Sequence, residues 1–156
     1  MNPEELHEAY AAIGAAIWHL QFLEDVLVTY VTMRLRLEPE APANQADRVL
    51  AAERRRTLGS LLTAATDGGL LVGDIADGFR LLLDERNWLV HRSMLEVSDR
   101  LYSPDVREPF LVRVRTLADR AIELKKALFA DASAWCATQG VDLKRVDELA
   151  FERFRK

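Results

Sequence analysis

The sequence predicts an all-α protein, an up-and-down bundle of four long helices followed by a short C-terminal helix. Along most of the 156 residues, apolar side chains recur at spacings of three and four, the period of an amphipathic helix. No segment alternates apolar and polar residues, so no strand is expected. The length suits one domain and no linker or internal repeat divides it, so we expect residues 1–156 to form a single domain.

The first helix is predicted to begin at Pro3 and to run to about Leu37. Asn2 suits its N-cap, and the two glutamates after Pro3 match the positive end of the helix dipole. The proline-containing segment 38–43 ends this helix. Caps such as Asn44 and Asp74 and glycines such as Gly140 delimit the others. These helices are expected at about 44–65, 74–97 and 108–138, with a short one from Asp142 onward.

Apolar residues lie on two sides of the first helix. The main stripe consists of Leu6, Tyr10, Ile13, Ile17, Leu20, Leu27, Val31 and Leu35. The second consists of Ala11, Ala15, Trp18, Phe22, Val26 and Met33. A helix that is apolar on two sides packs against two partners. Either it lies at the centre of the bundle, or the face with Trp18 and Phe22 meets its counterpart in a two-fold dimer.

Composition restricts the classes of function. The net charge of −4 argues against coating of nucleic acid or membrane by bulk charge, so a polyanion would have to meet a local patch. The single cysteine, Cys136, cannot form an internal disulfide, and we expect a cytoplasmic protein. No apolar run reaches the ~18 residues that span a bilayer, so no membrane partner is expected. Phosphate-binding glycine loops and zinc-ligand spacings are missing from the sequence, and neither a cofactor nor a metal is expected.

Two ionisable residues occupy positions where the helical pattern calls for apolar ones. Glu24 lies between Leu20 and Leu27 on the main stripe of the first helix, and Arg86 has the same placement in the third. A carboxylate and a guanidinium can satisfy each other where a lone buried ion could not. We therefore predict that Glu24 and Arg86 are close in space, within one chain or across a dimer. Such a pair could serve only to fix the register of the helices.

The segment around Arg86 carries a motif. It reads Glu85-Arg86-Asn87-Trp88-Leu89-Val90-His91, with a polar residue directly after the arginine and a histidine five positions beyond it. This motif, late in the third helix and combined with an acid in the first, resembles the HEPN superfamily (higher eukaryotes and prokaryotes nucleotide-binding). The resemblance covers the first four helices and makes 1–156 a single HEPN-like domain. It departs from one toxin branch at Ser93, where a tyrosine is common.

The resemblance implies a homodimer whose two motifs share one cleft and, in active members, a metal-independent endoribonuclease. Arg86 and His91 match the catalytic pair, Asn87 the polar position, and Glu24 the supporting acid of the first helix. Histidine ordinarily titrates near pH ~6.5, so two imidazoles could act as base and acid. Arginine would stabilise the phosphorane. Five positions on an ideal helix rotate by ~140°, so either the helix distorts near His91 or opposite protomers supply the two groups.

The sequence also offers candidate residues for RNA binding and candidate partners. Arg80 and Arg92 flank the motif and are candidates for RNA binding, and the run 54–56 is a weaker candidate. RNA is the expected substrate, and the resemblance implies a toxin or phage-defence effector held by an antitoxin or regulatory protein. The alternative is a catalytically silent HEPN-like dimer that binds a protein partner or a nucleotide, in which Arg86 only neutralises Glu24.

Overall fold

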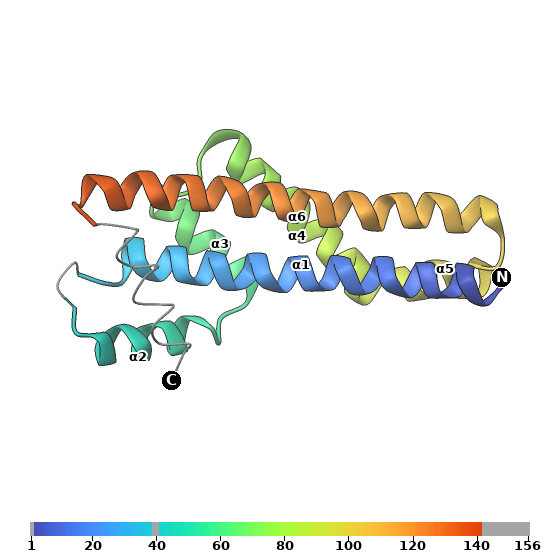
Figure 1. Ribbon diagram of the computed structural model, residues 1–156, viewed down its shortest axis with the longest axis horizontal. Coiled ribbons are helices and arrows are strands. Elements are labelled where there is room, and N and C mark those ends of the chain that lie inside the picture. Colours follow the sequence, from blue (N-terminus) through green and yellow to red (C-terminus); the bar gives the residue numbers. More distant parts are fainter. Residues whose placement is uncertain (1, 39–40, 142–156) are drawn as a thin grey trace.

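The computed structural model describes residues 2–38 and 41–141, and the regular structure in these ranges is helical (Figure 1). The elements are α1 (Pro3–Leu35), α2 (Ala43–Glu53), α3 (Leu58–Asp67), α4 (Gly73–His91), α5 (Ser93–Val97), a 3₁₀ turn (Ser98–Arg100) and α6 (Pro104–Thr138). The prediction of an all-α protein is confirmed for these residues. The short helix expected from Asp142 onward lies outside the described residues.

The two longest helices, α1 and α6, lie side by side and run in the same direction (Figure 1). Side chains that join them keep a nearly constant separation in sequence. Arg107 Nη2 is 2.8 Å from Glu5 Oε1 near the beginning of both helices, and Arg34 Nη1 is 2.7 Å from Asp131 Oδ2 near their ends. α1 and α6 are therefore a parallel pair.

α4 is the long helix that returns between them. Glu85 of α4 pairs with Arg113 of α6, and three residues later the ring of Trp88 lies 5.9 Å from that of Phe110. The sequence numbers rise on α4 and fall on α6, so the two helices are antiparallel. In an up-and-down bundle of four, the first and last helices would be antiparallel as well. They are parallel here because only one long helix connects α1 to α6.

The second expected helix, 44–65, is two short helices in the structure. α2 begins at Ala43, so Asn44 lies in its first turn and does not cap it. Thr57 has extended backbone angles and caps α3, its hydroxyl accepting a hydrogen bond from the backbone N–H of Ser60 at 3.3 Å. Threonine is a favoured N-cap residue because its hydroxyl can accept a hydrogen bond from the first turn of the helix. The cap interrupts a pattern that otherwise reads as one helix, and neither half spans the bundle.

The third expected helix, 74–97, ends earlier than its apolar pattern suggests. α4 ends at His91, and Arg92 leaves the helical region with φ −121° and ψ −29° before α5 begins. At the other end, Val72 occupies the N-cap position and Asp74 lies in the first turn, so Asp74 is not the cap. His91 is therefore the last residue of its helix, which matters for the motif.

The outer ends of α1 and α6 follow the sequence closely. Asn2 and Glu5 form a reciprocal capping box at the beginning of α1, with hydrogen bonds of 2.8 and 2.9 Å. Gly140, at φ +72°, ends α6 in a left-handed conformation that glycine adopts without strain. α6 begins at Pro104, about one turn before the expected start near Glu108. Proline suits a first helical position because its missing N–H has no partner there.

The core lies where α1, α3, α4 and α6 meet. Side chains from all four helices are almost completely buried, and their burial is what holds the long pair together. The largest of them are Phe79, Leu23, Leu27, Leu61, Leu82, Leu111, Leu117, Val31 and Val114. α2 contributes no buried residue. On α1, Leu20, Leu27 and Val31 of the main stripe are buried in this core, whereas Trp18 and Phe22 of the second stripe are 68% and 45% exposed.

One finding bears on the expectation about membranes. An 18-residue window of α1 has a mean hydropathy of 1.3, enough by length and composition to cross a bilayer, and a third of it is buried. A core helix of a soluble protein passes the same test. The sequence analysis counted unbroken apolar runs, which is a different criterion, so its expectation of no membrane partner stays a prediction.

A buried ion pair fastens the beginning of α1 to α6. The Arg107 side chain is only 7% exposed, and its partner Glu5 also caps α1. We predict that Glu5→Ala lowers the free energy of unfolding by about 3 kcal/mol, because the buried Arg107 keeps, among the described residues, only the more distant carboxylate of Glu108, at 3.8 Å, and α1 loses half of its capping box. Adding Arg107→Met should recover the part of the loss that comes from the buried charge, measured in urea titrations. Glu4→Ala, an exposed change in the same turn, is the control, and equal stability of Glu4→Ala and Glu5→Ala would contradict the prediction.

Candidate functional site

The motif occupies the last two turns of α4, between α1 and α6. Arg86 and Glu85 are consecutive, so their side chains leave the helix about 100° apart. Arg86 reaches α1 and Glu85 reaches α6. The end of α4 thereby connects both long helices, and the residues that matched the motif lie at this junction.

The predicted pairing of Glu24 and Arg86 is confirmed, within one chain. Arg86 Nε lies 3.4 Å from Glu24 Oε1, and Arg86 Nη1 donates a 3.4 Å hydrogen bond to Asn87 Oδ1. Burial is less than expected, because each side chain of the ion pair is 30% exposed. If one partner is substituted, water can solvate the charge of the other. Loss of the pair should therefore cost about 1 kcal/mol of stability rather than the larger penalty of a buried, unpaired ion. The contact is long for a charge-assisted hydrogen bond, and other anions can compete for the guanidinium.

His91 is exposed at the very end of α4. The helix is regular up to this residue, so the rotation of about 140° from Arg86 holds and the two side chains leave in different directions. Among the described residues, no hydrogen bond joins His91 to Arg86. The structure therefore brings Arg86 to Glu24 and Asn87, and leaves His91 facing outward on its own.

Exposed apolar side chains surround the motif. Val90 is 50% exposed, and Met94 and Leu95 of α5 are 77% and 86% exposed. We call the side of α4 that carries Arg86 and Val90, together with Glu24 of α1, the motif face; His91 leaves α4 on another side. Large exposed apolar residues of this kind are typical of surfaces that bind another protein.

The face of α1 with Trp18 and Phe22 points elsewhere. Trp18 is 68% exposed, and it leaves α1 about 120° around the axis from Glu24. A two-fold contact through Trp18 would leave the two motifs on outer sides of the dimer. The sequence analysis gave the Trp18 dimer as one alternative, and the resemblance separately implied a shared cleft; which face a dimer uses stays a prediction.

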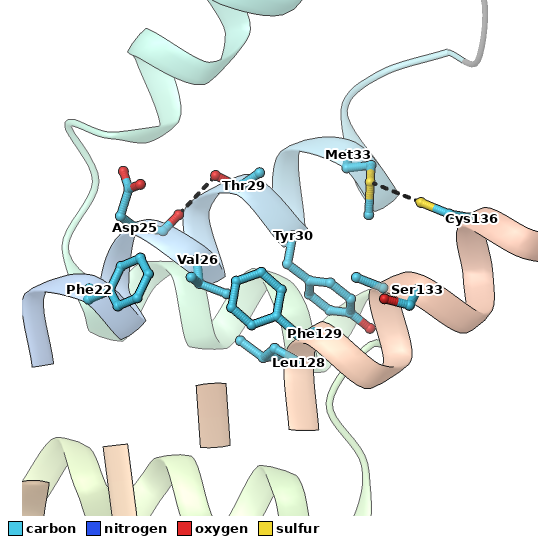
Figure 2. Close-up of a pocket in the computed structure, with 11 residues that line it drawn as sticks. Phe22, Asp25, Val26, Thr29, Tyr30, Met33, Leu128, Phe129, Ser133 and Cys136 are labelled. Carbon is cyan, nitrogen blue, oxygen red and sulfur yellow. Dashed lines mark hydrogen bonds between the residues drawn. The ribbon is translucent and has the colours of Figure 1, made fainter. Parts of the chain in front are cut away.

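Part of the Trp18 side forms an apolar groove between α1 and α6, with a volume of about 350 Å³ (Figure 2). Phe22, Val26 and Met33 of α1 face Phe129 and Cys136 of α6 across it. Cys136 is buried, and its Sγ lies 4.0 Å from Met33 Sδ. The groove lies away from the motif, so these residues are not candidates for its chemistry.

Of the other arginines predicted to bind RNA, most are paired with a carboxylate, and Arg92 is exposed without an ion pair among the described residues. Arg80 pairs with Asp77 at 2.6 Å and leaves α4 about 120° around the axis from Arg86, so it is not part of the motif face. Arg92 is exposed directly after His91. In the run 54–56, Arg54 pairs with Asp25 at 2.9 Å and Arg56 with Glu53 at 2.8 Å.

Sequence reasoning missed a second cluster, between α4 and α6. Glu85 accepts hydrogen bonds from Arg113 Nε at 2.6 Å and Arg113 Nη2 at 2.9 Å, and the guanidinium stacks 3.5 Å from the centroid of the Trp88 ring. The hydrogen bond from Arg113, aided by the charges of Arg113, Arg120 and Arg92, lowers the pKa of Glu85. The same bond raises the pKa of Arg113. Only the long-range pairing of α4 with α6 creates this cluster, so no local sequence signal marks it.

Within residues 2–38 and 41–141, no group of three histidine, cysteine, aspartate or glutamate side chains is placed to hold a metal ion. Comparisons with models of protein families, with curated proteins and with solved structures return no match. The resemblance to the HEPN superfamily therefore depends on the motif residues themselves and on their placement.

Because the pKa of Glu85 is lowered, the free energy of unfolding depends on pH. The stabilisation that the ionised Glu85 side chain provides is complete above the ordinary pKa of 4.5, and it is lost as the pH falls through the lower pKa of the folded state. We predict that wild type is more stable than Glu85→Gln at pH 7, and that the difference shrinks as the pH falls below about 4.5. Urea titrations at several pH values measure it. A stability difference that stays constant down to pH 3 would show that the contribution of Glu85 to stability does not come from its charge.

Proposed function

We propose that this protein is a metal-independent endoribonuclease of the HEPN type, acting as a homodimer with a composite cleft. The observation that carries the proposal is the placement of the motif: Arg86 is accessible and weakly held by Glu24, and His91 is exposed one turn further along the same helix. A long, partly solvated ion pair leaves Arg86 able to exchange its carboxylate for a phosphate.

The chemistry uses groups of both protomers. A base takes the proton of the ribose 2′-hydroxyl, whose oxygen attacks the adjacent phosphorus, and an acid protonates the departing 5′-oxygen. The two copies of His91 supply these roles across the dimer, since imidazole as a class of side chain can accept or donate a proton. Arg86 stabilises the negative charge on the phosphorane, and Asn87 orients Arg86 through the hydrogen bond between them. Glu24 holds the guanidinium in place before RNA binds.

The motif face is the surface that this dimer would use. Val90 is half exposed and leaves α4 about 40° from Arg86, so it can give the contact an apolar centre. A two-fold axis through this face brings each motif close to its copy, whereas an axis through Trp18 does not. An antitoxin or regulatory protein that covers the motif face would keep such a cytoplasmic toxin or phage-defence effector inactive.

A second function is favoured by the same ion pair. Glu24 neutralises Arg86 within the chain, which would suit a silent HEPN-like dimer that binds a protein partner or a nucleotide. In that case Arg86 is a structural residue, and RNA is not a substrate. The two functions differ in what His91 does, because an exposed histidine contributes little to the fold.

We predict that the wild type cleaves RNA and that His91→Ala lowers the rate by about 10²–10⁴-fold, the usual contribution of a general acid or base. Arg86→Ala should lower it by at least about 100-fold. Arg80→Ala makes the same change of charge on another face of α4 and serves as the control. Cleavage of labelled RNA is measured after circular dichroism has shown that each variant is folded. Unchanged cleavage in His91→Ala would reject the catalytic role and favour the silent dimer.

A second prediction concerns the interface. Val90→Lys should convert the dimer to a monomer and abolish cleavage, because it places a charge at the centre of the motif face. Trp18→Lys is the matched control on the other side of α1 and should leave both properties unchanged. Sedimentation equilibrium gives the mass of each. A Trp18→Lys monomer together with an intact Val90→Lys dimer would place the interface on the wrong face for a composite cleft.

A further inference from the structure

A second set of arginines lies where α4 faces α6: Arg113 and Arg120 belong to α6, and Arg92 directly follows α4. Arg113 and Arg120 line a cavity of about 260 Å³ between the two helices, together with Glu85, Thr116 and Leu117. Glu85 leaves α4 about 100° around the axis from Arg86, so this cavity and the motif face occupy neighbouring sides of one helix. Nothing in the proposed chemistry uses the cavity.

The cluster holds more positive than negative charge. The charges of Arg113, Arg120 and Arg92 all act on the single carboxylate of Glu85. Among the described residues, Arg113 is paired with Glu85, whereas Arg120 and Arg92 take part in no ion pair.

The acidic neighbours do not remove this excess. Glu96 acts on Arg113 and accepts a 2.7 Å hydrogen bond from Trp88 Nε1. Glu123 on α6 is paired with Lys126 at 2.8 Å. In the lining of the cavity two guanidinium groups, Arg113 and Arg120, meet one carboxylate, that of Glu85. Asp119 and Glu123 border Arg120 in the next cavity. The guanidinium groups of Arg120 and Arg92 have no hydrogen-bond partner among the described residues.

One of the three arginines is rigidly held. Arg113 is bonded through Nε and Nη2 to Glu85, and it stacks on Trp88, a ring that is only 4% exposed. A guanidinium fixed in this way has lost its rotamer freedom before any ligand arrives, so it binds an anion at a lower entropic cost. Its Nη1 has no hydrogen-bond partner among the described residues. Planar guanidinium groups match phosphate oxygens in pairs, which ammonium groups do not.

We propose that Arg92, Arg113 and Arg120 form a second phosphate-binding site, which holds the RNA strand next to the bond that the motif cleaves. This inference rests on the proposed function, because it takes RNA as the ligand. Arg92 follows His91 directly in sequence and stands seven positions, about two helical turns, beyond Glu85 on the same side of α4. A strand of linked phosphates can contact Arg86 and this cluster together. The net charge of −4 makes such a local patch necessary for any RNA-binding protein of this composition.

Binding is measured with a fluorescein-labelled single-stranded RNA of about ten nucleotides, by fluorescence anisotropy between 50 and 200 mM NaCl. The protein carries His91→Ala so that the RNA stays intact. Arg120→Gln and Arg92→Gln are each expected to weaken binding about fivefold at 100 mM salt and to reduce the slope of log K against log salt by about 0.7, the value for one phosphate contact on a single strand.

Two control substitutions remove the same charge outside the cluster. Arg80→Gln lies on α4 and is paired with Asp77, and Arg115→Gln lies on α6 and is paired with Glu8. Both should keep the affinity and the slope of the parent. If Arg120→Gln and Arg92→Gln behave like these controls, the second site is overturned.

Cleavage by otherwise wild-type protein separates the inference from the proposed function. If the protein cuts RNA but Arg120→Gln changes neither Kd nor KM, the second site fails and the nuclease stands. If it cuts no RNA but binding still depends on Arg120 and Arg92, the nuclease fails and the phosphate-binding site stands. No binding of RNA by the parent at 50 mM salt overturns the site.

Discussion

The parallel contact between α1 and α6 is the constraint on which the rest of the structure depends. Each helix is too long to be covered by a short partner, and buried residues recur from Ala9 to Thr32 on α1 and from Arg107 to Cys136 on α6. Because both run the same way, the chain must return between them, and α4 is the helix that does so. α4 therefore contacts both partners, and the consecutive residues Glu85 and Arg86 form ion pairs with α6 and α1. The motif lies at this junction.

Local signals in the sequence predicted much of this arrangement. The class of fold, the capped beginning of α1, the glycine that ends α6 and the pairing of Glu24 with Arg86 all follow from residue type and spacing. The break at Thr57 and the end of α4 at His91 could not be predicted, because the residues around them suit a helix as well as a turn. The parallel order and the bond between Glu85 and Arg113 arise from long-range contacts, which no local pattern encodes. Whether Arg86 and His91 perform chemistry stays a prediction.

The two sides of α1 have different consequences for function. The side with Glu24 borders the motif, while the side with Trp18 leads to the apolar groove (Figure 2). A partner bound to the second side would leave the motif accessible to RNA. The charges are divided in a similar way on α4, where Arg86 is balanced by a carboxylate of α1 and the cluster on the α6 side retains an excess of guanidinium. An acidic protein can bind a polyanion only through such local asymmetry.

The chemical form of the RNA ends tests the central claim most directly. Mass spectrometry of products formed in the presence of EDTA identifies the groups left at the cleaved bond. Attack by the 2′-hydroxyl, assisted by His91 and Arg86, predicts fragments that end in a 2′,3′-cyclic phosphate, each followed by a fragment with a 5′-hydroxyl. Fragments with 3′-hydroxyl ends, or cleavage that stops when divalent metal is removed, would contradict the account.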